Sequence, residues 1–401
     1  MTDTYRAAEH PPGAGGRASG RAATGVRPAL PPVVEPALMH FDTPLELSCG
    51  RTLPAFDLSY ETYGQLAPDG GNAVLVCHSL TKGAHAAGRR TPQDRHPGWW
   101  DAAIGPGRML DTDRYFVICS DVLAGAGAST GPASTDPATG RRYAGDFPVV
   151  TIEDMVNAQF RLVERLGVTR LHAVVGGCFG GQQALQWAVS HPDAVRNAVV
   201  IGTGPDTSAH TVAIFSVMRH LIRSDPRFAD GDYYDGPGPV QGLAGALVAA
   251  VPVWMSREAM GQRFARRTVT GRQRRYTLGP EFAVEAFLDQ IAHRQHADID
   301  PNALLHLMRA EEYFDLPGQY GGLEAALRPV RARTLFVSYG SDWRYPPEET
   351  DALHQVLRRQ GKPSRHTVLD SALGHGAFLY EVDALAREVT PFLAAAPGEG
   401  R

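Results

Sequence analysis

The chain has 401 residues, of which 43% are hydrophobic and 20% charged, and its formal net charge at pH 7 is −4. That length suffices for one large α/β domain with an insertion, or for two domains. The weak negative charge and the absence of Lys/Arg runs argue against a nucleic-acid partner, and no apolar stretch reaches the roughly 18 residues of a membrane-spanning helix.

The N-terminal segment, residues 1–33, is rich in Gly, Ala, Arg and Pro and poor in large apolar residues. It cannot bury enough surface to offset the entropy of ordering, so we predict a disordered tail. It lacks the apolar core of roughly 7–15 residues that a secretory signal needs. Its acidic residues and prolines favour a plain tail over a transit peptide.

Short apolar runs rich in β-branched residues alternate with helical patterns along most of the chain. The strand candidates are residues 73–77, 115–119, 171–175, 198–201, 334–338 and 365–369. The helical candidates are residues 152–166, 182–190, 212–222, 282–291 and 347–360. This alternation predicts an α/β fold, with a mostly parallel central sheet that helices cover on both faces.

The strand rhythm stops between residues 207 and 329, where helical spacing and Gly/Pro-rich breaks take over. We therefore predict a core of residues 34–206 and 330–395, with a helical lid, 207–329, inserted between its two parts. The Arg-dense stretch 263–275 in this lid is either a solvated or interface helix face or a contact to an anionic cofactor.

The chain has four cysteines, and sparse cysteine usage is typical of a reducing cytoplasm. Cys77 and Cys119 lie in apolar runs and are expected in the core. No close-set Cys/His cluster indicates a metal site, so we expect none.

Cys178 stands at the apex of a strand–turn–helix pattern. The apolar run 171–175 leads into Gly176-Gly177-Cys178-Phe179-Gly180-Gly181, and a helical segment follows. This is the form of the nucleophile elbow of α/β-hydrolase folds, in which glycines permit strained dihedrals and close backbone approach. Serine is usual at the apex, and a thiol keeps the geometry but changes the chemistry.

An acid and a histidine follow Cys178 in the order that this fold requires. Asp342 lies directly after the buried strand candidate 334–338, and His375 lies in a glycine-flanked loop after the last one. His375 would take the proton of Cys178, and Asp342 would orient the imidazole. Asp370 is a rival acid, but it is close to His375 in sequence.

Acyl transfer also needs N–H donors for the developing oxyanion. We expect one from Phe179, which follows the nucleophile, and one from Leu80, in the loop after strand candidate 73–77. The GxxxxGK[ST] pattern of a phosphate loop is absent, and residues 125–131 do not have the GxGxxG spacing of dinucleotide binding.

Several blocks of the chain together resemble the homoserine O-acetyltransferases of the α/β-hydrolase type, over roughly residues 38–395. The blocks are the elbow, Leu75–Thr81, Pro97–Asp101, Ile104–Gly107, Asp111–Cys119, Ser129–Ser134, Asp146–Ile152, Ser341–Trp343 and Gly374-His375.

The resemblance implies a CoA-dependent acyltransferase that passes an acyl group from acetyl-CoA (succinyl-CoA in some members) to the hydroxyl of homoserine or a related hydroxy acid. With Cys178 as nucleophile, the reaction would be ping-pong through an S-acyl-cysteine. By the same resemblance Arg219 matches an arginine for the acceptor carboxylate, and Tyr233 and Tyr234 fall in an acceptor-contacting region. A cytoplasmic homodimer in methionine biosynthesis, with acyl-CoA as co-substrate and no bound cofactor, is also implied.

Three residues or segments depart from this family's pattern. Cys178 replaces its usual serine, and Gly376 follows His375 where the family has an aspartate that helps hold the acceptor's amino group. The lid helix reads Ile214-Phe215-Ser216 where the family has a more polar Asn-Glu pair. A buried ammonium without a counter-charge is costly, so the last two departures favour an acceptor that lacks the ammonium or binds differently. The alternative is that the aspartate was lost by neutral drift, without a change of acceptor.

Two other functions remain open at this level. The same triad could serve an esterase or thioesterase in which water replaces the acceptor, or the chain could be a non-catalytic paralogue. The sequence gives neither the acceptor nor the acyl length.

Overall fold

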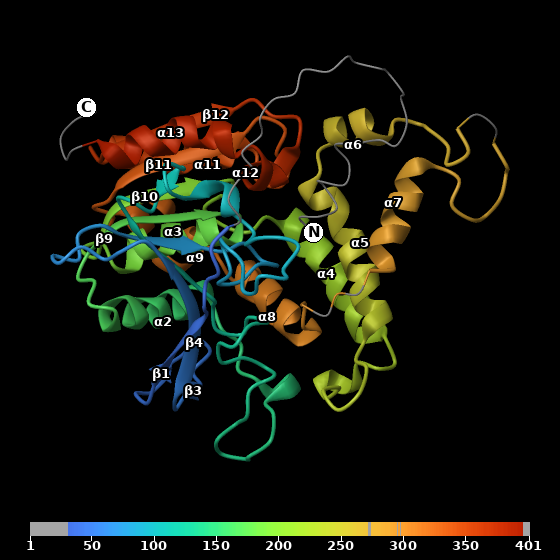
Figure 1. Ribbon diagram of the computed structural model, residues 1–401, viewed down its shortest axis with the longest axis horizontal. Coiled ribbons are helices and arrows are strands. Elements are labelled where there is room, and N and C mark those ends of the chain that lie inside the picture. The colour runs from blue at the N-terminus through green and yellow to red at the C-terminus, as the bar shows by residue number, and fades with distance from the viewer. Residues whose placement is uncertain (1–30, 272–273, 295, 297, 396–401) are drawn as a thin grey trace.

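An eight-stranded sheet lies at the centre of the computed structural model, which describes residues 31–271, 274–294, 296 and 298–395 (Figure 1). The strands lie in the order β1 (Ala37–Phe41), β4 (Phe56–Tyr63), β8 (Phe116–Ser120), β5 (Ala73–Cys77), β9 (Leu171–Gly177), β10 (Val195–Ile201), β11 (Arg333–Tyr339) and β12 (Ser364–Leu369). Two small sheets pair β2 (Leu45–Glu46) with β3 (Thr52–Leu53) and β6 (Ile104–Gly105) with β7 (Leu110–Asp111).

The central sheet is parallel from β8 to β12, and β4 pairs antiparallel with both β1 and β8. Every residue of β5 is buried, as expected of a strand covered on both faces. The predicted α/β fold with a mostly parallel sheet is therefore confirmed.

The six predicted strands all form, and the differences have physical causes. β10 begins at Val195 rather than at residue 198. The polar Asn197 can lie inside this strand because its buried side-chain amide donates a hydrogen bond to the carbonyl of His172 at 2.7 Å. The antiparallel strands β1 and β4 were not predicted. Glu61 and other polar residues interrupt the apolar character of β4, and Glu61 is buried against His85 and Arg90.

Helices flank the sheet and follow its strands. They are α2 (Ile152–Arg165), α3 (Phe179–Ser190), α11 (Pro347–Arg359), α12 (Ala377–Tyr380) and α13 (Val382–Ala394). α2 begins where the sequence predicts because Thr151 and Asp154 form a reciprocal capping box. α3 packs against β5, β9 and β10, so the residue that precedes it is fixed relative to three strands.

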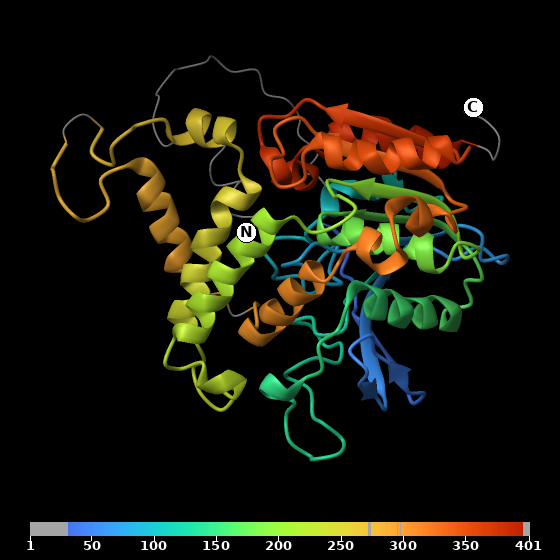
Figure 2. The same cartoon turned by 180° about the vertical axis from the view of Figure 1, so that it is seen from behind.

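Between β10 and β11 the described residues form helices and no strand longer than a single bridge. These helices are α4 (Ala209–Ser224), α5 (Val240–Trp254), α6 (Arg257–Phe264), α7 (Ala283–Ala292), α8 (Pro301–Glu312), α9 (Leu316–Tyr320) and α10 (Leu323–Leu327). In both views α4, α5 and α7 stand together beside the sheet and its flanking helices (Figures 1 and 2). The boundaries 34–206, 207–329 and 330–395 stay a prediction.

The predicted tail, residues 1–33, falls almost wholly outside the described residues; of its described part, Val33 forms a bridge with Arg89. In the part of the chain that the structure describes, no helix is both long and apolar enough to cross a membrane.

Candidate active site

Cys178 lies in a strained turn between β9 and α3. Its φ is 60° and its ψ −126°, a conformation that costs a non-glycine residue on the order of 1–3 kcal/mol. Glycine is required on either side: a Cβ at Gly176 would lie 2.0 Å from the carbonyl oxygen of Gly180, and one at Gly180 would lie 2.1 Å from that of Cys77. The Cys178 N–H donates to the carbonyl of Ile201 at 2.9 Å, which ties the turn to β10.

Asp342 and His375 meet next to this turn. Nδ1 of His375 lies 2.8 Å from Oδ2 of Asp342, and both side chains are buried. The other oxygen, Oδ1, accepts from the backbone N–H groups of Arg344 at 2.9 Å and Tyr345 at 3.1 Å. Asp370 is exposed, so the structure pairs the histidine with the first acid and not with its rival.

The loop of His375 is braced against the loop of Asp342. The hydroxyl of Ser341 accepts from the Gly374 N–H at 3.0 Å and donates to the carbonyl of Ser371. Ser341, which directly precedes Asp342, therefore fixes the turn that directly precedes His375. This contact helps to hold Asp342 and His375 at hydrogen-bonding distance.

The charge of His375 depends on its two neighbours. Burial lowers the pKa of its imidazole, but the negative charges of Asp342 and Cys178 outweigh burial and raise the pKa to about 10. Among the described residues no partner meets Nε2 of His375 at normal hydrogen-bond geometry. A raised pKa favours the protonated imidazole, which can donate a proton, and the role of His375 as the base that takes the proton of Cys178 stays a prediction.

The two predicted oxyanion donors border the same turn. Phe179 is the first residue of α3, and the first N–H groups of a helix have no partner within it. Leu80 lies in the loop after β5 and lines the cavity that contains Cys178. The structure thus brings Leu80 to the cavity of Cys178 and Phe179 to the start of α3, and their role as oxyanion donors stays a prediction.

The cavity at Cys178 has a volume of about 100 Å³ and mostly apolar walls. His375, Leu80 and Arg344 also line it. The apolar and aromatic wall residues are Phe215, Met218, Leu247, Ala250, Val253, Trp254, Phe378, Leu379 and Tyr380. Several of them come from α4 and α5, so the helices between β10 and β11 cover the nucleophile.

Arg344 is a site residue that the sequence reasoning missed. Its Nη1 lies 3.5 Å from the sulfur of Cys178, and its guanidinium forms a buried ion pair with Glu311. The available signal was its position two residues after Asp342, on the same loop at the carboxyl end of β11.

The three residues predicted to hold the acceptor do not line the cavity of Cys178. Arg219 pairs with Glu312 and lines a separate cavity of about 310 Å³ between α4 and α8. Tyr233 and Tyr234 both donate to the carboxylate of Asp300. Each of these side chains is already occupied by a carboxylate of the protein itself.

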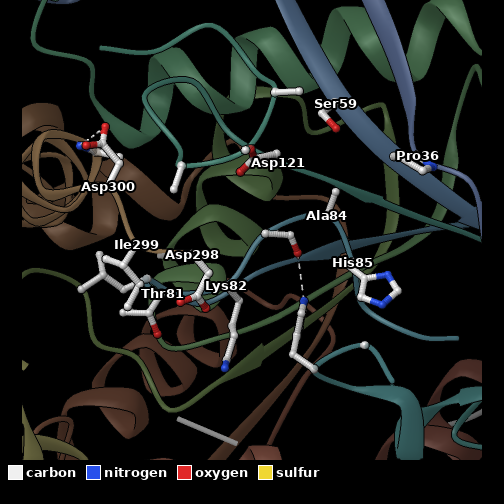
Figure 3. A pocket seen from close by; sticks show the side chains of 18 of the residues that line it. Pro36, Ser59, Thr81, Lys82, Ala84, His85, Asp121, Asp298, Ile299 and Asp300 are labelled. Carbon is white, nitrogen blue, oxygen red and sulfur yellow. Dashed lines mark hydrogen bonds between the residues drawn. The ribbon is translucent and has the colours of Figure 1, made fainter. Parts of the chain in front are cut away.

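A larger cavity of about 460 Å³ adjoins the cavity of Cys178, and Thr81, Lys82, Asp121 and Asp300 are among the residues that line it (Figure 3). It shares Leu80, Thr81 and Lys82 with the smaller cavity, and its wall mixes cationic and acidic side chains. This mixture selects no ligand charge by itself. Within the described ranges no three His, Cys, Asp or Glu side chains are grouped as a metal site would need.

Known proteins are similar to this chain in both sequence and structure. Residues 72–382 match the α/β-hydrolase fold family. The chain is 44% identical over 365 residues to a homoserine O-succinyltransferase of Halothiobacillus neapolitanus, covering 90% of each chain. The structure resembles homoserine O-acetyltransferase from Bacillus anthracis (TM-score 0.85, 30% identity, 90% of this chain and 98% of that one) and esterase E22 (TM-score 0.82, 30% identity, 90% and 100%).

Proposed function

Because the chain belongs to the homoserine O-acyltransferase family of the α/β-hydrolase fold, and is an acyltransferase, we propose that it acts by a ping-pong mechanism through S-acyl-Cys178. The observation that carries the proposal is a strained Cys178 beside a buried Asp342–His375 pair. Acetyl-CoA is the proposed donor, and succinyl-CoA is the second one to test because relatives are named for both acyl groups.

In the first half-reaction the thiolate of Cys178 attacks the thioester carbonyl. The N–H groups of Leu80 and Phe179 stabilise the oxyanion that forms. The C–S bond to CoA then breaks, and the protonated His375 gives its proton to the leaving CoA thiolate. The products are the S-acyl enzyme, free CoA and a neutral imidazole.

In the second half-reaction the neutral His375 takes the proton of the acceptor hydroxyl, whose oxygen attacks the acyl carbon. The bond from the acyl carbon to the sulfur of Cys178 breaks, and its electron pair returns to sulfur. Asp342 holds the imidazole in one orientation through both steps. Exchange of an acyl group between two thiols is close to thermoneutral, so the S-acyl enzyme keeps the group activated for transfer.

For the acceptor we propose a hydroxy acid related to homoserine but without its ammonium group. The walls around Cys178 are mostly apolar, and none of the described residues that line this cavity is an Asp or a Glu. Gly376 offers no side chain, and the ring of Trp254 lies 3.6 Å from the position of a Cβ there. A buried ammonium would therefore lack a counter-charge, at a cost of kilocalories.

The acceptor proposal is tested with a matched pair of substrates. Homoserine and 4-hydroxybutyrate carry the same hydroxyl and carboxylate and differ only in the ammonium. We expect acetyl-CoA-dependent ester formation to be faster with 4-hydroxybutyrate. Faster transfer to homoserine would refute the changed acceptor and leave acyl transfer intact.

Release of CoA without any acceptor distinguishes transfer from hydrolysis. We expect CoA release to stop after one equivalent and to resume when an acceptor is added. Steady release that no acceptor accelerates would instead favour a hydrolase, such as esterase E22, whose fold is similar.

By similarity to its family we also propose a cytoplasmic homodimer, with a role in methionine biosynthesis only if homoserine proves to be the acceptor. Light scattering on the purified chain measures the oligomeric state, and a single-chain mass would refute the dimer.

A further inference from the structure

We propose that Arg344 is a further catalytic residue, which stabilises the anionic sulfur of Cys178 both as nucleophile and as leaving group. The inference rests on the proposed role of Cys178 as the acyl carrier. It goes beyond that role because it assigns the charge partner that a thiol, rather than a hydroxyl, requires.

The contact between the two side chains is direct. Nη1 of Arg344 donates to the sulfur of Cys178 at 3.5 Å. Only 6% of Arg344 and 4% of Cys178 are exposed to solvent. A full positive charge at this distance acts strongly on sulfur because little water is present to screen it.

Arg344 is held in this position on both sides. Its guanidinium pairs with Glu311, which also accepts from the hydroxyl of Tyr345 at 2.8 Å. The guanidinium carbon lies 5.3 Å from the ring centroids of both Phe215 and Tyr345, within the range of cation–π attraction. The side chain is therefore pre-organised and needs no rearrangement when charge develops on sulfur.

The main chain of Arg344 joins the same network. Its N–H donates to Oδ1 of Asp342 at 2.9 Å, while Oδ2 of Asp342 binds His375. One residue thus contacts the acid through its backbone and the nucleophile through its side chain. A change that keeps the backbone but removes the guanidinium separates these two effects.

The charges around the sulfur show why the guanidinium is needed. With Cys178 as thiolate, the buried negative groups are Cys178, Asp342 and Glu311, and the positive groups are His375 and Arg344. Burial lowers the pKa of Arg344, but Glu311 and Cys178 outweigh burial and raise it well above its ordinary value, so the guanidinium stays charged. Without it, three buried negative charges would face one imidazolium.

This arrangement suits sulfur chemistry in both half-reactions. Sulfur is negative before it attacks the donor, and it becomes negative again when the bond to the acyl carbon breaks and its electron pair returns. A serine oxygen would be neutral in both resting states. Arg344 and Cys178 therefore act as a pair, and the benefit of the arginine should depend on the cysteine.

The test measures the charge on sulfur without any acyl donor. All variants carry Cys49→Ser, because Cys49 is the exposed thiol, whereas Cys77 and Cys119 are fully buried. The readouts are the rate of alkylation by iodoacetamide and the thiolate absorbance at 240 nm, each measured against pH. Arg344→Met removes the charge, and Arg309→Met is the matched control, since Arg309 pairs with Glu312 one residue beyond Glu311.

We expect Arg344→Met to slow alkylation at pH 7 by about 10- to 1,000-fold and to move the thiolate absorbance to higher pH, as loss of an adjacent opposite charge does. Glu311→Gln should leave alkylation equally fast or make it faster, because Arg344 keeps its charge. Arg309→Met should match the parent. In a Cys178→Ser background, Arg344→Met should reduce acyl transfer much less than it does with the cysteine.

A double variant keeps the test informative if Arg344→Met does not fold, because Glu311 would then be buried unpaired. Arg344→Met with Glu311→Leu removes both charges at similar volume, a replacement that folded proteins often tolerate. Alkylation of this variant at the parental rate would overturn the proposal.

A different result would assign Arg344 to a substrate carboxylate instead. In that case Arg344→Met would raise KM for succinyl-CoA but not for acetyl-CoA, and would leave alkylation and its pH dependence unchanged. Conversely, an enzyme whose alkylation depends on Arg344 but which never carries an acyl group would refute the proposed function and leave the Arg344–Cys178 pair standing.

Discussion

The carboxyl edge of the sheet and the helices between β10 and β11 have different relations to the family pattern. At the sheet edge, Cys178, Asp342 and His375 converge as the order of the motifs predicts. Among the helices, Arg219 and Tyr233 are bound to carboxylates of the protein and do not reach the same cavity.

The difference follows from how each region positions its side chains. The catalytic candidates sit at strand ends and in turns that the sheet fixes, so motif order suffices to place them. The positions of the acceptor-side residues depend on how one helix packs on another. A small rotation of a helix can point a side chain toward the cavity or away from it without changing the fold. We infer that acyl chemistry is retained while the acceptor end has changed.

The largest effect is expected at the sheet edge, from His375→Ala. Removing the proton donor and acceptor of both half-reactions should lower the rate of acyl transfer by roughly 10³- to 10⁴-fold. Stopped-flow measurement of CoA release checks this, with His354→Ala as a control on α11. A loss of less than tenfold in the rate of acyl transfer would contradict the catalytic role of His375 at the sheet edge.

Cys178→Ser tests whether Cys178 and His375 form an ion pair at the carboxyl edge of the sheet. The imidazolium of the parent enzyme is present below its pKa of about 10, so activity should be level through neutral pH and fall as pH rises through that value. The serine variant instead needs neutral His375 as base, so its activity should rise with pH. At pH 7 it should be about 10²-fold slower. Parallel pH profiles for the two enzymes would contradict the ion-pair description.

Gly376→Asp introduces the aspartate that the homoserine O-acetyltransferases have after the catalytic histidine. Its Cβ would lie 3.4 Å from the carbonyl oxygen of Trp254, which is close to ordinary contact. We expect the ratio of kcat/KM for homoserine over 4-hydroxybutyrate to rise by about 10- to 100-fold, the value of a hydrogen bond to a charged group. Gly376→Asn is the uncharged control, and an equal rise with both variants would contradict a charge effect.

The smallest effect is expected from Arg219→Met. Because Arg219 is paired with Glu312 outside the cavity of Cys178, acceptor KM should change by less than about threefold. A rise of 100-fold would assign the acceptor carboxylate to Arg219 after all, and would require Glu312 to release it during binding.

The sequence predicts the parallel strands and the catalytic order well because both depend on local patterns. A run such as Ala73–Cys77 is apolar throughout, and the glycines around Cys178 permit only one kind of turn. The contact of Arg344 with Cys178 joins residues 166 positions apart, and its pairing with Glu311 joins a loop to α8. Long-range pairs between polar side chains leave no periodic signal in a single sequence, so they had to be found in the structure.

The most direct test of the central claim is intact-mass measurement after the Cys49→Ser enzyme is mixed with acetyl-CoA in the absence of acceptor. The account predicts one acetyl adduct per chain, mapped by peptide analysis to Cys178, lost on addition of 4-hydroxybutyrate and absent in Cys178→Ala. Acetyl transfer that proceeds at full rate in Cys178→Ala, or an adduct that maps to another residue, would contradict it.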